Sequence, residues 1–247
     1  MLTATAAQAQ DAPICTDRPA RANAVCTVPA GKWQLETAAV DWLTLKQGNS
    51  KTDTLLLGGS LAKFGLTASS DLQVAFTPLM RVSTDDSHIS GFGDVTVRFK
   101  QRLTGAHSAV QVAVIPFVKL PTAKRGIGNR KIEGGLALPI SFALAGPVTA
   151  TLGPEADVLA DGDGHGRHVA IVQLVNLSAP VAPRLTLIGE LWANWNLDPD
   201  GTVRQASADV AAAYAASDTV QLDVGANLGL TRNTPDVELN AGISTRF

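Results

Sequence analysis

The chain ends on residues 238–247, ELNAGISTRF, a stretch in which polar and apolar side chains alternate. Counting from Val237, the odd positions are mostly apolar and the even positions are polar or small. Successive side chains of a β-strand point to opposite faces, so this pattern predicts a strand with one apolar face and one polar face. The rest of the sequence has to indicate what the apolar face contacts.

The same alternation recurs upstream, in runs of roughly ten residues that are separated by turns. It is cleanest in runs 92–104, 184–196 and 219–231, whereas runs 53–66 and 168–178 do not define which parity is apolar. Run 203–214 is rich in alanine, the best helix former, but its polar side chains alternate and we expect a strand there. The predicted strands are 32–44, 53–66, 71–83, 92–104, 108–121, 131–144, 147–159, 168–178, 184–196, 203–214, 219–231 and 237–247.

The connections between these runs alternate in length. The five that follow even-numbered runs are short, such as TGAH at 104–107 and AGP at 145–147. The six that follow odd-numbered runs are mostly longer and richer in Gly, Asp and Asn, such as ADGDGHGR at 160–167. Short periplasmic turns, longer external loops and an even strand number are typical of bacterial outer-membrane barrels.

A sheet can cross a bilayer only if it is closed, because hydrocarbon offers no partner for the backbone groups of an edge strand. The sequence therefore predicts an all-β fold, a closed antiparallel transmembrane β-barrel of about 12 strands located in the bacterial outer membrane. Trp33, Trp195, Tyr214 and Phe247 fall near run ends, where aromatic girdles lie. No stretch reaches 18 uninterrupted apolar residues, so no transmembrane helix is predicted. The alternative fold is a soluble sandwich or a lipocalin-like barrel, whose strands alternate in the same way.

The chain divides into three predicted parts. Residues 1–9 end in a small-x-small cleavage pattern, Ala-Gln-Ala, and we interpret them as the remnant of a signal peptide; a disordered terminus is the alternative. Residues 10–31 form an N-terminal segment that either plugs the barrel or stays as a periplasmic tail, and residues 32–247 form the barrel. The two cysteines, Cys15 and Cys26, lie in this segment. Export to an oxidising compartment favours a disulfide between them, with two reduced thiols as the alternative.

If the polar faces of the strands line the lumen, the charged side chains divide between two walls. Cations from runs 92–104 and 108–121 would face acidic side chains from the later runs, which would set a transverse field across the lumen. The alternative is a salt-bridge network that fills a narrow barrel and leaves no passage. In a plug, Asp17 and Arg18 would bond to these wall charges. The lumen-lining candidates are Arg98, Lys100, Arg102, Lys119, Glu133, Glu155, Asp157, Glu190, Asp209 and Asp223.

Other function classes find little support in the sequence. The formal net charge is -2 and the charges are scattered, which argues against nucleic-acid binding. His165 and His168 lie in a Gly/Asp-rich loop without further ligands at metal-binding spacing, so we predict no metal site and no cofactor. The chain has no GxSxG motif, and we expect no enzymatic activity; an outer-membrane hydrolase is a minor alternative.

The stretch at residues 15–42, CTDRPARANAVCTVPAGKWQLETAAVDW, contains a TDRP motif followed by VPAG-x-x-QLE. It resembles the N-terminal region of the outer-membrane proteins grouped as the meta-pathway of phenol degradation family. Residues 63–74, 91–103 and 116–123 are similar to middle repeats of that family. The resemblance implies an outer-membrane barrel that passes small molecules, aromatic ones among them, and it carries no established set of substrate-contacting residues.

The expected function is thus passive uptake of small hydrophobic or aromatic molecules through an outer-membrane channel. A structural or adhesive barrel with a blocked lumen is the alternative. The expected partners are outer-membrane lipid, a small-molecule solute and the barrel-assembly machinery, which would recognise the C-terminal strand that ends in Phe247.

Overall fold

The computed structural model describes residues 13–247, so the predicted signal remnant at 1–9 lies outside the described residues. The described chain consists of β-segments joined by turns and loops, and it contains no helix long and apolar enough to cross a membrane. The segments are β1 (Trp33–Gln47), β2 (Ser50–Thr67), β3 (Ser70–Phe76), β4 (Leu79–Thr84), β5 (Ser87–Gly91), β6 (Val95–Arg102), β7 (Val110–Leu120), β8 (Glu133–Ala137), β9 (Ile140–Ala145), β10 (Val148–Leu152), β11 (Glu155–Ala160), β12 (Arg167–Ala182), β13 (Leu185–Asn196), β14 (Val203–Ala215), β15 (Val220–Gly229) and β16 (Val237–Arg246).

Eight of these 16 segments join end to end in pairs, which leaves 12 strands that span the barrel. The pairs are β3 with β4, β5 with β6, β8 with β9 and β10 with β11. A proline or glycine stands in every interruption: Pro78, Gly93, Pro139, and Gly153 with Pro154. Proline has no N–H for the ladder and glycine packs no side chain, so the ladder breaks there while the strand direction continues. The prediction of 12 strands is confirmed, including the alanine-rich run that forms β14.

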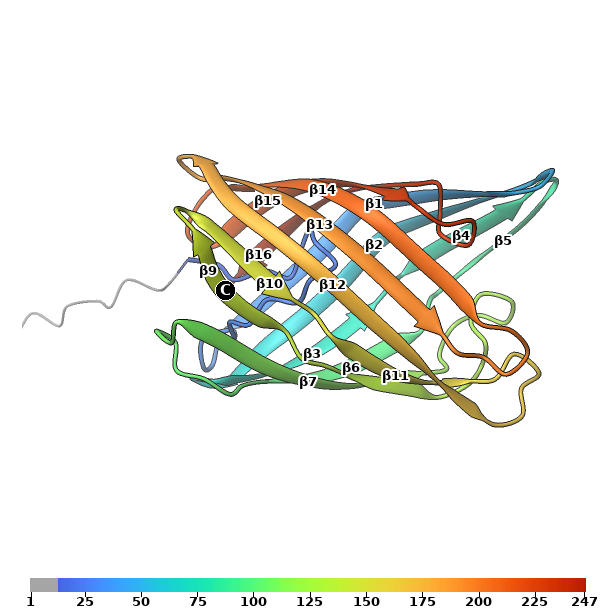
Figure 1. Ribbon diagram of the computed structural model, residues 1–247, viewed down its shortest axis with the longest axis horizontal. Helices are drawn as coiled ribbons and strands as arrows, with labels where there is room; N and C mark the ends of the chain where they lie inside the picture. The colour runs from blue at the N-terminus through green and yellow to red at the C-terminus, as the bar shows by residue number, and fades with distance from the viewer. Residues whose placement is uncertain (1–12) are drawn as a thin grey trace, which may run out of the picture.

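The sheet closes because β1 pairs antiparallel with both β2 and β16 (Figure 1). The pairing of Gln34 with Arg246 and of Thr44 with Val237 fixes the register of the seam, and Phe247 donates its backbone N–H to the carbonyl of Trp33. The start of β1 and the end of β16 therefore lie at the same end of the barrel, as an even strand number requires. The predicted closed antiparallel barrel is confirmed.

The two faces of the wall are the reverse of those of a soluble protein. Leu191 and Val210 are 60% and 61% exposed on the outer face, whereas Lys63 and Lys100 are 1% and 0% exposed on the inner face. Lysine is almost never fully buried unless it is paired, and exposed leucine over a whole belt needs an apolar partner. An outer surface in contact with lipid and a polar interior meet both conditions, so the soluble sandwich is excluded.

The structure resolves the two strands whose phase the sequence left open. In β12 the even positions face inward, since His168, Ala170, Leu174 and Asn176 are all buried. In β2 the inward parity changes along the strand, because Leu56 and Leu61 line the same cavity inside the barrel. The change falls at Gly58, which has a φ of 69°, opposite a shift of register in β1 between Ala38 and Val40. A left-handed residue of this kind lets a strand change the face that it presents.

Candidate functional site

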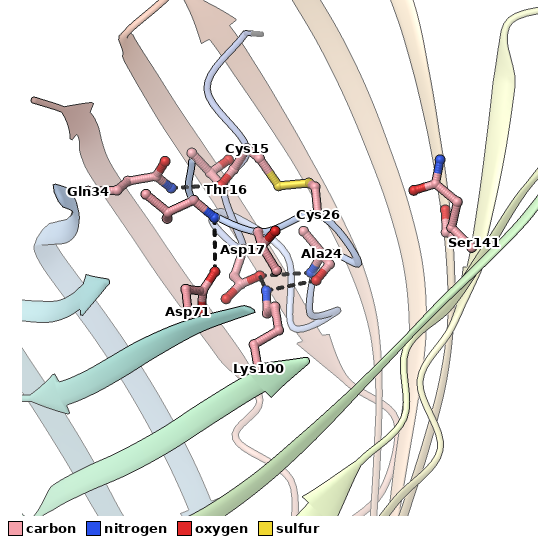
Figure 2. The surroundings of a disulfide bond; sticks show 12 residues. Cys15, Thr16, Asp17, Ala24, Cys26, Gln34, Asp71, Lys100 and Ser141 are labelled. Atoms are coloured by element: carbon pink, nitrogen blue, oxygen red, sulfur yellow. Dashed lines mark hydrogen bonds and ion pairs between the residues drawn. A yellow bond between two sulfur atoms is a disulfide. The ribbon is translucent and has the colours of Figure 1, made fainter. Parts of the chain in front are cut away.

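The N-terminal segment, residues 13–31, lies inside the barrel and is bonded to its inner wall (Figures 1 and 2). The predicted disulfide is confirmed: Cys15 and Cys26 are joined, with their Cα atoms 6.2 Å apart. The bond closes a loop that contains Asp17, Arg18 and Arg21. The acidic side chain, Asp17, reaches one wall of the lumen, and the two basic side chains, Arg18 and Arg21, reach the opposite wall.

Asp17 is bound by the cationic wall, which strands β2 and β6 provide. Its carboxylate lies 2.8 Å from the Nζ atom of Lys63 and 3.0 Å from that of Lys100. Lys100 also donates to the backbone carbonyl of Ala24 at 2.7 Å, as Figure 2 shows. Burial raises the pKa of Asp17, but Lys100, Lys63 and Arg98 outweigh it and hold that pKa well below its usual range. Asp17 is therefore the ionised centre of this cluster.

Arg18 and Arg21 are bound by the acidic wall, which strands β13 to β16 provide. The Nη2 atom of Arg18 lies 2.7 Å from Asp223. Arg21 reaches two carboxylates, with Nε 3.2 Å from Asp209 and Nη2 2.5 Å from Glu238. Its guanidinium also lies over the ring of Trp192, 4.9 Å from the centroid, a cation–π contact on β13. The same short segment thus carries the complementary charge to each wall.

Wall carboxylates and amides also bind the backbone of the segment. Glu36 on β1 accepts hydrogen bonds from the backbone N–H groups of Asp17 and Arg18, at 2.9 and 3.1 Å. Glu190 on β13 accepts the N–H groups of Arg21 and Ala22, both at 3.0 Å. Toward the ends of the segment, Asp71 accepts the N–H of Val28, and Gln34 donates to the carbonyl of Cys15. An irregular segment inside a barrel has no ladder to join, so these bonds satisfy its backbone in place of a sheet.

The ten lumen-lining candidates have different partners. Lys100 and Arg98 bind the segment through Asp17 and Asn23, and Glu190, Asp209 and Asp223 bind it from the other side. Lys119 pairs instead within its own wall, with Asp94 at 2.8 Å and Glu133 at 3.1 Å. Arg102 donates to the carbonyl of Ala68 at the short-turn end. Glu155 and Asp157 line a cavity.

Several residues of this network were missed by the sequence reasoning. Lys63 lies in a strand whose phase was ambiguous. Glu36, near the start of β1, was considered only as part of the QLE motif. Arg21 was overlooked although it follows the TDRP motif by two residues. The charge pattern of the segment could have indicated it. One acid followed by two arginines is complementary to a lumen with one cationic wall and one acidic wall.

Three cavities surround the segment inside the barrel. One of about 290 Å³ borders Cys15 and Cys26, together with Ser178 and Thr186 on the wall. Another, of about 440 Å³, borders Asp41, Leu56, Leu61 and Phe76. A third, of about 250 Å³, borders Glu155, Asp157 and Trp192. Residues of the segment line all three of these spaces.

The loop histidines occupy a separate place at the long-loop end. The Nδ1 atom of His168 lies 2.8 Å from Asp161 and 3.7 Å from Asp198, and His165 bonds to the backbone of Asp163. Across residues 13–247, no group of three or more His, Cys, Asp or Glu side chains is arranged to hold a metal ion.

A closed barrel with a lipid-facing apolar belt and a charged interior is an outer-membrane β-barrel, here with a segment of its own chain in the lumen. The sequence comparison agrees with this class. Residues 16–247 match the model of the family described as "Putative MetA-pathway of phenol degradation", and the chain belongs to that family. No curated protein matches the chain.

The fold is similar to solved outer-membrane proteins. The COG4313 outer membrane channel from Pseudomonas putida F1 superimposes with a TM-score of 0.70 and 17% identity, covering 90% of this chain and 98% of that one. The NanC porin gives a TM-score of 0.55 at 10% identity, over 84% of this chain and 99% of the porin. The translocator domain of the autotransporter NalP from Neisseria meningitidis gives 0.51 at 12% identity, over 89% and 90% of the two chains. At these identities the comparison establishes the shared fold.

Proposed function

We propose that the chain is a passive outer-membrane channel for small hydrophobic or aromatic molecules, with residues 13–31 acting as its plug. The observation that carries the proposal is the two-sided attachment of the segment, by Asp17 to one wall and by Arg18 and Arg21 to the other. The plug is held by ion pairs and hydrogen bonds. When it shifts, water in the lumen can replace these bonds. The fold shared with an outer membrane channel and a porin supports the same reading.

The size and lining of the cavities support small, partly apolar solutes. Each cavity beside the segment has a volume of about 250 to 440 Å³, which is at the low end of small-molecule sites. The largest of these three cavities presents Leu56, Leu61 and Phe76 to the lumen beside charged groups. An apolar patch in a polar lumen lowers the cost of holding an aromatic ring without excluding water from the rest of the path. No catalytic role is part of this proposal.

A barrel with a permanently blocked lumen is the second candidate, because the same ion pairs could serve only to fill the interior. Single-channel conductance in planar bilayers separates the two. The double variant Asp17→Asn/Arg21→Gln removes one attachment on each wall, and we expect it to conduct more than the wild type. The matched control is Lys51→Gln/Asp53→Asn, which removes an ion pair of 2.7 Å on β2 away from the segment and should leave the conductance unchanged. Equal conductance in all three proteins would favour the blocked barrel.

The C-terminal strand is also proposed to recruit the barrel-assembly machinery. Phe247 is 67% exposed and follows the apolar outer positions Leu239 and Ile243 of β16. An exposed terminal aromatic side chain beside the seam is available to a partner before β1 and β16 close. Phe247→Ala should lower the amount of assembled barrel in the outer membrane, measured as the heat-modifiable band on a gel, whereas Phe142→Ala on β9 should not.

A further inference from the structure

The cavity of about 250 Å³ lies between the N-terminal segment and the wall formed by β8, β11, β12 and β13. The segment contributes Arg21 and Asn23, and the wall contributes Glu155, Asp157, Trp192 and Asn194, together with the apolar side chains Val172 and Leu174. By volume the cavity corresponds to about eight water molecules at roughly 30 Å³ each. It is therefore large enough for an organic group and not only for a single bound water.

The cavity is lined by two carboxylates, those of Glu155 and Asp157, that form no ion pair with the described chain. Glu155 and Asp157 stand two residues apart on β11, so their side chains lie on the same face of the strand. Among residues 13–247 neither carboxylate has an ion-pair or hydrogen-bond partner, whereas the other wall carboxylates that contact the segment are bonded to it. The neighbouring cations are paired with other acids, Arg21 with Asp209 and Glu238, and Arg98 with Asp17 at 4.0 Å. Two adjacent carboxylates without a paired cation favour the uptake of positive charge, either as a proton or as a bound cation.

The remaining lining indicates what else such a cation should carry. Asn194 has a buried Oδ1 atom without a hydrogen-bond donor, so the cavity presents a further acceptor to an N–H group. The ring of Trp192 already holds one cation, the guanidinium of Arg21, at 4.9 Å from its centroid. Val172 and Leu174 add apolar surface beside it. Acceptors at one end and aromatic or aliphatic surface at the other suit a solute with a charged nitrogen and an apolar body.

We propose that this cavity binds small organic cations with an aromatic or aliphatic body, of the arylalkylammonium class. The ammonium group is held by Glu155 and Asp157 and donates to Asn194, while the body packs against Trp192, Val172 and Leu174. The inference rests on the proposed function, because it names a solute class for the same lumen. Its binding step nevertheless needs no transport and can be measured in the closed barrel.

The test is calorimetric titration of the purified, detergent-extracted full chain with benzylammonium chloride. Benzyl alcohol has almost the same shape without the charge, and benzoate reverses the charge. We expect benzylammonium to bind at least about tenfold more tightly than benzyl alcohol, and benzoate not to bind. Equal affinity for benzylammonium and benzyl alcohol would overturn the proposal. Loss of benzylammonium binding in an equal concentration of sodium chloride would assign the cavity to inorganic cations and would overturn it as well.

Two variants assign the binding to the cavity. Glu155→Gln/Asp157→Asn should reduce the preference for benzylammonium over benzyl alcohol to less than about twofold, since both charges are removed at nearly constant shape. Asp161→Asn/Asp198→Asn removes two carboxylates near His168 at the long-loop end, outside the cavity, and should keep the full preference. An unchanged preference in the first variant would place the cation elsewhere and refute the assignment.

The outcome is separable from that of the channel proposal. Benzylammonium binding to the wild type, together with no gain of conductance in Asp17→Asn/Arg21→Gln, would support the cation site and count against the channel. A gain of conductance in that variant, together with no benzylammonium binding to the wild type, would support the channel and overturn the cation site.

Discussion

At the scale of single residues, the lumen is organised by lysines that are hidden from solvent and paired. Lys63 bridges two acids, with its Nζ atom 2.8 Å from Asp17 on the segment and 2.5 Å from Glu36 on β1. A buried charge costs free energy unless its partners compensate it, and here the compensation joins the N-terminal segment to the wall. The same side chain therefore stabilises the barrel interior and determines where the segment sits.

Replacing Lys63 by Met should destabilise the protein by about 3–5 kcal/mol, because two buried carboxylates lose their common counter-charge. The measurement is the free energy of unfolding from urea titrations of tryptophan fluorescence. Lys51→Met is the matched control on the same strand, since its ion pair with Asp53 is exposed, and it should have no measurable effect. Equal effects of the two substitutions would mean that the Lys63 cluster does not hold the structure.

The depressed pKa of Asp17 gives a prediction for pH. A carboxyl group whose pKa is lower in the folded than in the unfolded state contributes stability above its unfolded pKa of about 3.9, and this stability is lost as the pH falls through the folded value. The difference in unfolding free energy between the wild type and Asp17→Asn should therefore be constant from pH 8 to pH 5 and should decrease only below about pH 4. A difference that already decreases between pH 7 and pH 5 would show that Asp17 is not held as an anion by the two lysines.

At the scale of elements, alternation predicted all the strands because lipid on one side and water on the other impose a period of two over their whole length. Alternation left the phase of β2 and β12 open, and in β2 the reason is that Gly58 changes the inward parity midway, which hides Lys63 from a pattern of fixed period. β14 shows the opposite case: its alanines favour a helix, yet pairing with β13 and β15 on both sides determines a strand. The N-terminal segment has no period at all. Its placement depends on single charges that find partners from strands far apart in the sequence, which local patterns do not report.

We expect the disulfide to favour the docked state of this segment. A bond between residues 11 positions apart restricts the loop that presents Asp17, Arg18 and Arg21, so the segment loses less conformational entropy when it docks. Cys15→Ser/Cys26→Ser should therefore show more frequent conducting events in planar bilayers than the wild type, and dithiothreitol should have the same effect on the wild type. Dithiothreitol should change Asp17→Asn/Arg21→Gln less than the wild type, because one ion-paired side chain toward each wall is already removed there. Unchanged gating in the serine variant, with normal heat-modifiable migration, would show that the ion pairs alone determine the docked state.

At the scale of the whole molecule, the lumen has a cationic side on β2 and β6 and an acidic side on β13 to β16, and the segment carries the opposite charge toward each. When the segment is displaced, both sides are left facing water and permeating ions. The charge of each wall then determines which ions accumulate there.

This arrangement predicts the ion selectivity of the open state. In the Asp17→Asn/Arg21→Gln background, Arg98→Glu changes the cationic side by two charge units in the lumen, so the reversal potential in a potassium chloride gradient should shift toward cation selectivity. Arg204→Glu makes the same change on the outer face of β14, beside the alternating inward residues Gln205 and Ser207, and should leave the reversal potential unchanged. Higher ionic strength should reduce the shift, because the Debye length falls from about 10 Å at 0.1 M to about 3 Å at 1 M. If Arg98→Glu and Arg204→Glu shifted the potential equally, or neither did, the permeating ions would not pass along the wall that holds Asp17 in the closed barrel.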